Sequence, residues 1–251
     1  MDFSITTILF ISILLLIVSA LYSSVGHGGA SGYLAVLSFF TFTPNQLATT
    51  ALILNIVVSG ISFFSYYRAG HFLFKSAYPF IIASVPAAFL GGMMHITNKT
   101  YYFLLSCVLI FAAIRMLLPL NEKPGENLSL PRTPITIITG GSIGMLSGIV
   151  GIGGGIFLSP LMILMKWAST KKTSAVAAFF ILVNSTSGLC GRYFGDTIEF
   201  QSMLPFIVAT FIGGLAGSYS GANFLSSISL RRILAVVLCI ASVKLIIKYF
   251  A

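Results

Sequence analysis

The sequence predicts an all-helical polytopic membrane protein whose two halves form an inverted repeat. Three observations lead to this prediction: charge is scarce, apolar segments recur at membrane-spanning length, and the two halves are alike. Of 251 residues, 57% are hydrophobic and 8% are charged, and the mean hydropathy is +1.02. Because soluble domains carry about 25% charged residues, 14 Lys and Arg with 5 Asp and Glu cannot cover a soluble domain of this length. Soluble, disordered and disulfide-stapled classes are therefore excluded.

A spanning helix needs about 20 apolar residues, and polar breaks divide the chain into ten candidates. The first is too long for the apolar core of a signal peptide and no Lys or Arg precedes it, so we expect a retained membrane helix. The most polar stretch separates two sets of five, which gives an N-terminal membrane repeat (1–120), a cytoplasmic linker (121–133) and a C-terminal membrane repeat (134–251). The expected segments are 3–25, 28–42, 45–67, 72–94, 99–119, 134–150, 153–166, 172–193, 200–222 and 229–250.

The two halves resemble each other at a fixed spacing. Residues 25–30 (VGHGGA) match 150–155 (VGIGGG) at an offset of 125, and 79–81 (PFI) match 205–207 (PFI) at an offset of 126. A tandem duplication explains both matches. Duplicated membrane halves around a shared midplane site are typical of transporters.

The distribution of Lys and Arg indicates the topology. If the short segments 28–42 and 153–166 turn back, the cations divide 8 to 6 between the two sides. If both segments cross, the division is 10 to 4. The positive-inside rule favours the second arrangement, an inverted repeat of five plus five segments with a cytoplasmic linker and both termini outside the cytoplasm. The net charge of +9 then reflects orientation, and no nucleic-acid partner is implied.

Glycine clusters interrupt the apolar sequence at equivalent places, 26–29 and 151–155. Each glycine inside a helix costs about 1 kcal/mol relative to alanine, and irregular backbone at membrane depth must face protein or a water-filled cavity. A helix that begins after such a break exposes N–H groups. Two such helix ends meeting would form an anion site. Close helix packing is the alternative, and we assign Gly140, Gly144 and Gly148 to it.

Neutral polar side chains complete the candidate site. Asn55 and Asn184 lie in mid-segment, and His27 is the only titratable side chain expected near the midplane. The acidic residues all lie at ends or in loops, so no carboxylate relay is expected through the bilayer. The candidate substrate-binding residues are Gly26, His27, Gly28, Gly29, Ser31, Asn55, Gly151, Gly153, Gly154, Gly155 and Asn184.

No cofactor or metal site is expected. Cys107, Cys190 and Cys239 are isolated in apolar stretches and are interpreted as small buried hydrophobic residues. Arg192, near a segment end, is expected to extend toward the membrane surface. Ser185 is a weaker candidate for the site.

The motifs of the second half resemble the TauE/SafE sulfite-exporter family. The similarity rests on 148–160 (GIVGIGGGIFLSP), 184–188 (NSTSG) and 231–235 (RRILA), and it spans essentially the whole chain. It implies a secondary transporter, not an enzyme, that carries small sulfur-containing anions such as sulfite, an organosulfonate or a sulfinate across the plasma membrane. The first half departs from the pattern, because His27 and Ala30 stand where Ile152 and Gly155 stand in the second.

Two other functions remain open. Residues 29–32 (GASG) fit the GxSG pattern of rhomboid-type intramembrane serine proteases, with Ser31 as nucleophile and His71 or His95 as base. An anion channel is the second alternative. The oligomeric state stays open.

Overall fold

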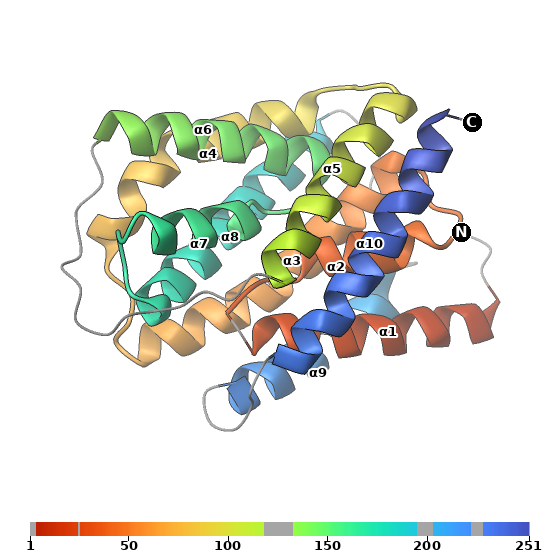
Figure 1. Ribbon diagram of the computed structural model, residues 1–251, viewed down its shortest axis with the longest axis horizontal. Coiled ribbons are helices and arrows are strands. Elements are labelled where there is room, and N and C mark those ends of the chain that lie inside the picture. Colours follow the sequence, from red (N-terminus) through yellow and green to blue (C-terminus); the bar gives the residue numbers. More distant parts are fainter. Residues whose placement is uncertain (1–3, 25, 118–132, 195–202, 222–227, 251) are drawn as a thin grey trace.

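The structure, a computed structural model, describes residues 4–24, 26–117, 133–194, 203–221 and 228–250. These ranges contain ten α-helices and no strand (Figure 1). The all-helical fold is confirmed, and each expected segment corresponds to one helix. The expected linker, 121–133, lies outside the described residues except for Thr133, which begins α6. The helices are α1 (Ile5–Ser23), α2 (Ala30–Ser38), α3 (Pro44–Arg68), α4 (Phe74–Met93), α5 (Asn98–Leu117), α6 (Thr133–Val150), α7 (Gly155–Leu164), α8 (Thr170–Tyr193), α9 (Leu204–Gly221) and α10 (Ile228–Phe250).

Equivalent N-cap residues precede α3 and α8. The Thr43 hydroxyl accepts a hydrogen bond from the Gln46 amide at 3.2 Å, and the Gln46 side chain accepts one from the Thr43 amide at 3.0 Å. This is a capping box, and Pro44 follows in the first turn. Ser169 occupies the N-cap position of α8 with the same extended backbone conformation, 126 residues after Thr43, but its side chain makes no capping hydrogen bond. The offset found between Pro79 and Pro205 therefore also relates the two caps.

The helices α2 and α7 are shorter than the segments 28–42 and 153–166 that predicted them. They have 9 and 10 residues, which corresponds to lengths of about 15 Å, half of the hydrocarbon core. Glycines keep the residues before each helix in nonhelical conformations, so neither helix spans a bilayer alone. α2 packs back along α1, since Gly32 contacts Val18 and the Phe40 ring lies 6.5 Å from the Phe10 ring.

The central helices α3 and α8 run antiparallel. Arg192, near the end of α8, donates to the side-chain amide oxygen of Asn45, near the start of α3, at 3.0 Å. Tyr66, near the end of α3, forms a hydrogen bond with Ser174, near the start of α8. An inverted arrangement of the two halves requires this antiparallel course, whereas parallel repeats would not produce it.

Small residues bring helices of different halves together. Gly140, Gly144 and Gly148 on α6 lie directly against the backbone of α4. On the other side of the molecule, Gly213 and Gly217 on α9 lie directly against the backbone of α1. The α6 glycines therefore have the packing role that we expected, since a Cβ atom at any of them would overlap the neighbouring backbone.

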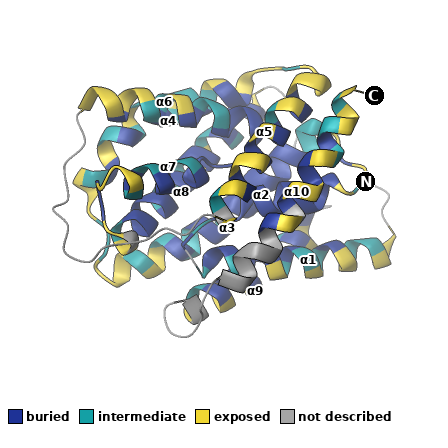
Figure 2. Cartoon of the chain, in the orientation of Figure 1, coloured by how far each residue is buried: buried dark blue, intermediate teal, exposed yellow. Residues whose placement is uncertain are grey.

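The outer face of the bundle is apolar. Ile5, Leu9, Ile13 and Ile17 follow one another along α1 with 47–79% of each side chain exposed, and Figure 2 shows exposed residues along the outer helices around a buried centre. Five helices, α1, α3, α4, α6 and α8, are long and apolar enough to cross a membrane. Such an exposed apolar surface identifies a lipid-facing protein. Cys107, Cys190 and Cys239 are exposed, so their expected burial is wrong: lipid solvates a thiol on an outward helix face as well as protein does.

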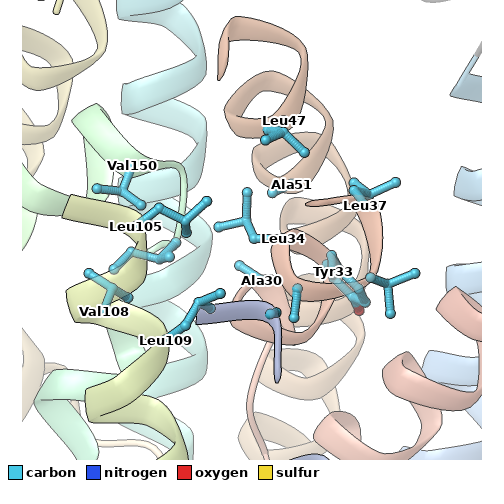
Figure 3. Close-up of a cluster of buried hydrophobic side chains, with 14 of the residues drawn as sticks. Ala30, Tyr33, Leu34, Leu37, Leu47, Ala51, Leu105, Val108, Leu109 and Val150 are labelled. Carbon is cyan, nitrogen blue, oxygen red and sulfur yellow. The ribbon is translucent and has the colours of Figure 1, made fainter. Parts of the chain in front are cut away.

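The short helix α2 lies at the centre of the protein. All nine of its residues are buried, and Figure 3 shows Leu34 and Leu37 among side chains of α3 and α5, with Val150 at the end of α6 close by. Irregular backbone next to a half-length helix is tolerated at membrane depth only when protein surrounds it. The buried side chains around α2 thus shield the first glycine break from lipid.

Candidate functional site

A glycine precedes each short helix, and its backbone has the left-handed conformation that favours glycine over other residues. Gly29 precedes α2 with φ of 99°, and Gly154 precedes α7 with φ of 80°. Neither supplies a side chain to the first amides of its helix, which have no intrahelical acceptor. The two helix N-termini therefore direct N–H groups and the positive ends of their dipoles into the protein interior.

The two breaks meet on one side chain, that of Asn55. A Cβ atom added to Gly28 would overlap the Asn55 carboxamide oxygen, and one added to Gly153 would overlap its nitrogen. Asn55 is fully buried on α3 and donates to the Ser185 hydroxyl at 3.0 Å and to the Ile152 carbonyl oxygen at 3.4 Å. Its own oxygen is buried and accepts no hydrogen bond among the described residues. An amide oxygen left in this state costs about 1–3 kcal/mol, and the Asn184 oxygen is buried in the same state; the Asn55 oxygen differs in lying against the first glycine break.

The position equivalent to Asn55 in the second half is Ile181, 126 residues later. Ile181 also lies between the breaks, since its Cγ2 atom would be 3.0 Å from a Cβ on Gly28 and 2.8 Å from one on Gly153. The centre consequently has one polar wall, Asn55 with Ser185, and one apolar wall, Ile181. Asn184 lies one turn further along α8 and donates to the Phe180 carbonyl oxygen of its own helix at 2.8 Å.

A small cavity lies where these elements meet. Its volume is about 10 Å³, close to the smallest space that holds a water molecule, so little room is left at this point. Both helix N-termini reach it, α2 through Ala30 and Ser31 and α7 through Ile156. The lining residues are Tyr22, His27, Gly28, Gly29, Ala30, Ser31, Asn55, Ile152, Ile156 and Ile181.

Hydrogen bonds hold the first break in place. The Tyr33 hydroxyl donates to the Gly28 carbonyl oxygen at 2.8 Å, and the His27 amide donates to the Tyr22 carbonyl oxygen at 3.0 Å. The Tyr22 and Ser31 hydroxyls are 2.8 Å apart. Ser31 is thus bonded to a phenol, while the partly buried His71 follows α3 and the exposed His95 follows α4. This geometry does not favour a protease that uses Ser31 with either of these histidines.

The remaining predicted glycines support the site from its edges. Gly26 lies against Ser174 and Gly151 against Ala48, and both have positive φ. Ala48 and Ser174 are themselves 126 residues apart, so each break packs against the equivalent position of the other half. Gly155 lies against Ile181, and Gly154 against Phe180 and Ile143. Of the predicted site residues, five line the cavity, His27, Gly28, Gly29, Ser31 and Asn55.

Arg192 is buried, with 7% of its surface exposed, which corrects the expectation that it extends toward the membrane surface. Its guanidinium donates to the Ile149 and Gly148 carbonyl oxygens at 2.6 and 3.2 Å, besides Asn45. The Tyr101 hydroxyl donates to the Val150 carbonyl oxygen at 3.1 Å. A cation at the negative end of α6 is favourable, and these bonds satisfy the last carbonyls before the second break.

We expect the change Arg192→Met to destabilise the protein by about 3 kcal/mol, because it leaves buried carbonyl oxygens without donors. The stability of Arg192→Lys should lie between those of the wild type and Arg192→Met, since one ammonium cannot replace all the donors of a planar guanidinium. Unfolding of the purified variants measures both losses of stability. The control is Lys99→Met, which removes an exposed cation at the start of α5. Equal stability of Arg192→Met and Lys99→Met would contradict this role.

Sequence reasoning did not assign five of the lining residues to the site: Tyr22, Ala30, Ile152, Ile156 and Ile181. A signal for Ile181 was present, because adding the offset of 126 to Asn55 leads directly to it. The others are apolar or aromatic residues beside the breaks, and nothing in their type distinguishes them from ordinary core residues.

A lipid-facing helical bundle with two broken helices meeting at a buried centre defines the class of polytopic membrane transporters. The family model described as "Sulfite exporter TauE/SafE" matches residues 11–245. The chain belongs to the TauE/SafE family and is a multi-pass membrane transporter.

Two relatives illustrate this membership. The chain is 34% identical over 240 residues to "Probable membrane transporter protein y4hK" of Sinorhizobium fredii (strain NBRC 101917 / NGR234), covering 94% of this chain and 97% of the relative. It is 24% identical over 247 residues to "Probable membrane transporter protein YjnA" of Bacillus subtilis (strain 168), covering 92% and 96%. No solved structure gives a significant match.

Proposed function

We propose that the protein is a secondary transporter of small sulfur-containing anions, such as sulfite, an organosulfonate or a sulfinate, and that the anion binds where the two glycine breaks meet. The observation that carries this proposal is the buried Asn55 side chain between Gly28 and Gly153, facing a cavity reached by two helix N-termini. Backbone N–H groups and helix dipoles favour an anion. The described residues include no Asp or Glu, so no fixed carboxylate among them opposes a negative ligand.

The unpartnered Asn55 oxygen narrows the ligand further. An anion whose atoms are all acceptors satisfies the helix N-termini but leaves this oxygen without a donor. Hydrogensulfite, which carries its own proton, satisfies both. A sulfonate bearing a hydroxyl or amino group would do the same, so the ligand itself supplies the donor that Asn55 needs.

A cavity of about 10 Å³ is too small for sulfite, so the helices must move to admit it. Alternating access by one half moving against the other supplies this movement. The proposal therefore treats 1–120 and 134–251 as the two repeats, joined by the linker 121–133.

Transport by purified protein in liposomes tests this function. We expect saturable uptake of ³⁵S-sulfite that is accelerated by sulfite on the opposite side. We also expect 2-hydroxyethanesulfonate to compete about tenfold better than ethanesulfonate, because one buried hydrogen bond is worth about 1.4 kcal/mol. Single-channel currents would contradict a carrier, and equal competition by the two sulfonates would contradict the role of the Asn55 oxygen.

The proposed orientation places the linker in the cytoplasm and both termini outside it. Arg68, Lys75, Lys171 and Lys172 lie at the helix ends opposite to Arg192 and Lys244, in keeping with the positive-inside rule. A reporter fused after Ala251 should therefore be active as a phosphatase and dark as a fluorescent protein that matures only in the cytoplasm. The reverse pattern would overturn the orientation in the plasma membrane.

A further inference from the structure

A second, larger cavity lies where α3 ends and α8 begins. Its volume is about 160 Å³, and its walls include Ser65, Tyr66, His71, Lys171 and Ser218. Five of the lining side chains carry hydrogen-bonding or charged groups on a largely apolar surface: an ammonium, an imidazole, a phenol and two hydroxyls that are 2.9 Å apart. The cavity is distinct from the small cavity around Asn55, and it has room for an oxyanion of the size of sulfite or sulfate.

Positive potential is concentrated at this cavity. Lys171 and Lys172 lie in the first turn of α8, where a helix favours acidic residues because its N-terminus is itself positive. Two cations there are unfavourable for the helix and attract an anion instead.

The floor of the cavity adjoins the first glycine break. Tyr66 hydrogen-bonds to Ser174, and both side chains touch Gly26, since an added Cβ would lie 2.8 Å from the Tyr66 Cε2 atom and 2.7 Å from the Ser174 Cβ atom. Gly28, two residues further along, lines the small cavity beside Asn55. The Tyr66–Ser174 pair and the break itself therefore lie between the two cavities along this path.

The offset of 126 residues relates this end to the opposite one. It takes Tyr66 to Arg192 and Asn45 to Lys171. At the far end, the Arg192 guanidinium donates to the Asn45 side chain and joins α8 to α3. At the near end, the equivalent pair, Tyr66 and Lys171, lines the second cavity. The two equivalent pairs thus differ, because one is hydrogen-bonded across the helices and the other borders a cavity.

We infer that this cavity is a vestibule that binds a small oxyanion through Lys171, His71, Ser65 and Ser218 before the anion passes Tyr66 to the centre. The inference rests on the proposed transport function for its purpose, but anion binding in the vestibule is measurable without any transport.

Thiol chemistry tests the vestibule directly. Cys107, Cys190 and Cys239 are replaced by alanine, and Ser65→Cys places one thiol in the cavity wall. We expect the anionic reagent sulfonatoethyl methanethiosulfonate to react faster than the cationic trimethylammonioethyl reagent, and sulfate to slow the anionic reaction. Lys171→Gln should lower the anionic-to-cationic rate ratio about thirtyfold at low salt, because one unit charge about 4 Å away in water changes each rate about fivefold and in opposite directions.

Two controls separate a vestibule from general surface charge. Lys75→Gln removes an exposed cation near the start of α4 and should leave the ratio within twofold. Thr97→Cys, before α5 at the other end, should show no effect of Lys171→Gln. The inference would be overturned if Lys171→Gln left the rate ratio at Ser65→Cys unchanged. It would also be overturned if Lys75→Gln lowered that ratio as much as Lys171→Gln does. If the ratio behaves as expected while liposomes show no sulfite uptake, the vestibule stands and the proposed substrate fails.

Discussion

Alanine at position 28 should abolish transport while the protein still inserts and folds. The added Cβ atom would lie 2.9 Å from the Asn55 Cγ atom and 3.0 Å from the Ile181 Cγ2 atom, and closer still to the Asn55 oxygen. Gly28 does not have a positive φ, so alanine strains no backbone there. The methyl group instead fills the space where the two breaks and Asn55 meet. We expect sulfite uptake below a hundredth of the wild-type rate, with overpacking that lowers stability by about 1–3 kcal/mol.

The matched control is Gly60→Ala on α3, one helix turn beyond Asn55. Its Cβ would meet only the Leu182 Cδ1 atom, at 3.9 Å, which is an ordinary contact. Gly153→Val should also abolish uptake, but it combines loss of space with strain, because Gly153 has φ of 69°. Normal uptake by Gly28→Ala in a correctly inserted protein would remove the breaks from the site.

The change Asn55→Leu should abolish anion transport without unfolding the protein. Leucine has the same number and branching of side-chain heavy atoms as asparagine, although its volume is larger, and it makes the wall opposite Ile181 apolar as well. It removes both the donor and the unpartnered acceptor, and because the Ile152 carbonyl and the Ser185 hydroxyl lose their donor, we expect stability to fall by about 1–3 kcal/mol. Losing two hydrogen bonds to a charged ligand is worth about 3 kcal/mol, so we expect about a hundredfold loss of affinity. The apparent affinity for sulfite in liposomes measures this loss.

Ser59→Ala is the control for Asn55→Leu. Ser59 is buried on the same helix, but its hydroxyl donates to the Ile56 carbonyl oxygen of its own turn. Its removal should change the affinity less than twofold. Asn184→Leu gives a second comparison: the Asn184 amide donates within α8, and we expect a smaller effect than at Asn55. A larger effect at Asn184 than at Asn55 would move the site along α8.

The membrane constraint explains how much of the fold was predictable. Lipid requires every backbone group to be satisfied within the protein, so apolar runs between polar breaks correspond one by one to helices. The break at Gly28 and its equivalent at Gly153 were visible for the same reason, because glycine clusters are too unfavourable to occur in spanning helices by chance. The exact start of α2, at Ala30, was not predictable, since it depends on the left-handed backbone of Gly29.

Side-chain roles at the centre were less predictable, because they depend on which residue of one half faces the other. Asn55 and Asn184 looked equivalent by type, yet the offset of 126 residues pairs Asn55 with Ile181. Arg192 looked like a surface cation, because its partners are backbone carbonyls 43 and 44 residues earlier in the chain. Backbone acceptors leave no trace in a sequence.

The central claim is that an anion binds where the two breaks meet, and its position in the protein is directly measurable. Selenite is the selenium analogue of sulfite, and anomalous diffraction from crystals grown with it locates the selenium atom. We predict a peak within contact of the Asn55 side chain and the first amides of α2 and α7, lost in crystals of Asn55→Leu. A second selenium peak in the vestibule would be compatible with the peak beside Asn55. A protein that transports selenite but shows no peak beside Asn55 would contradict the account.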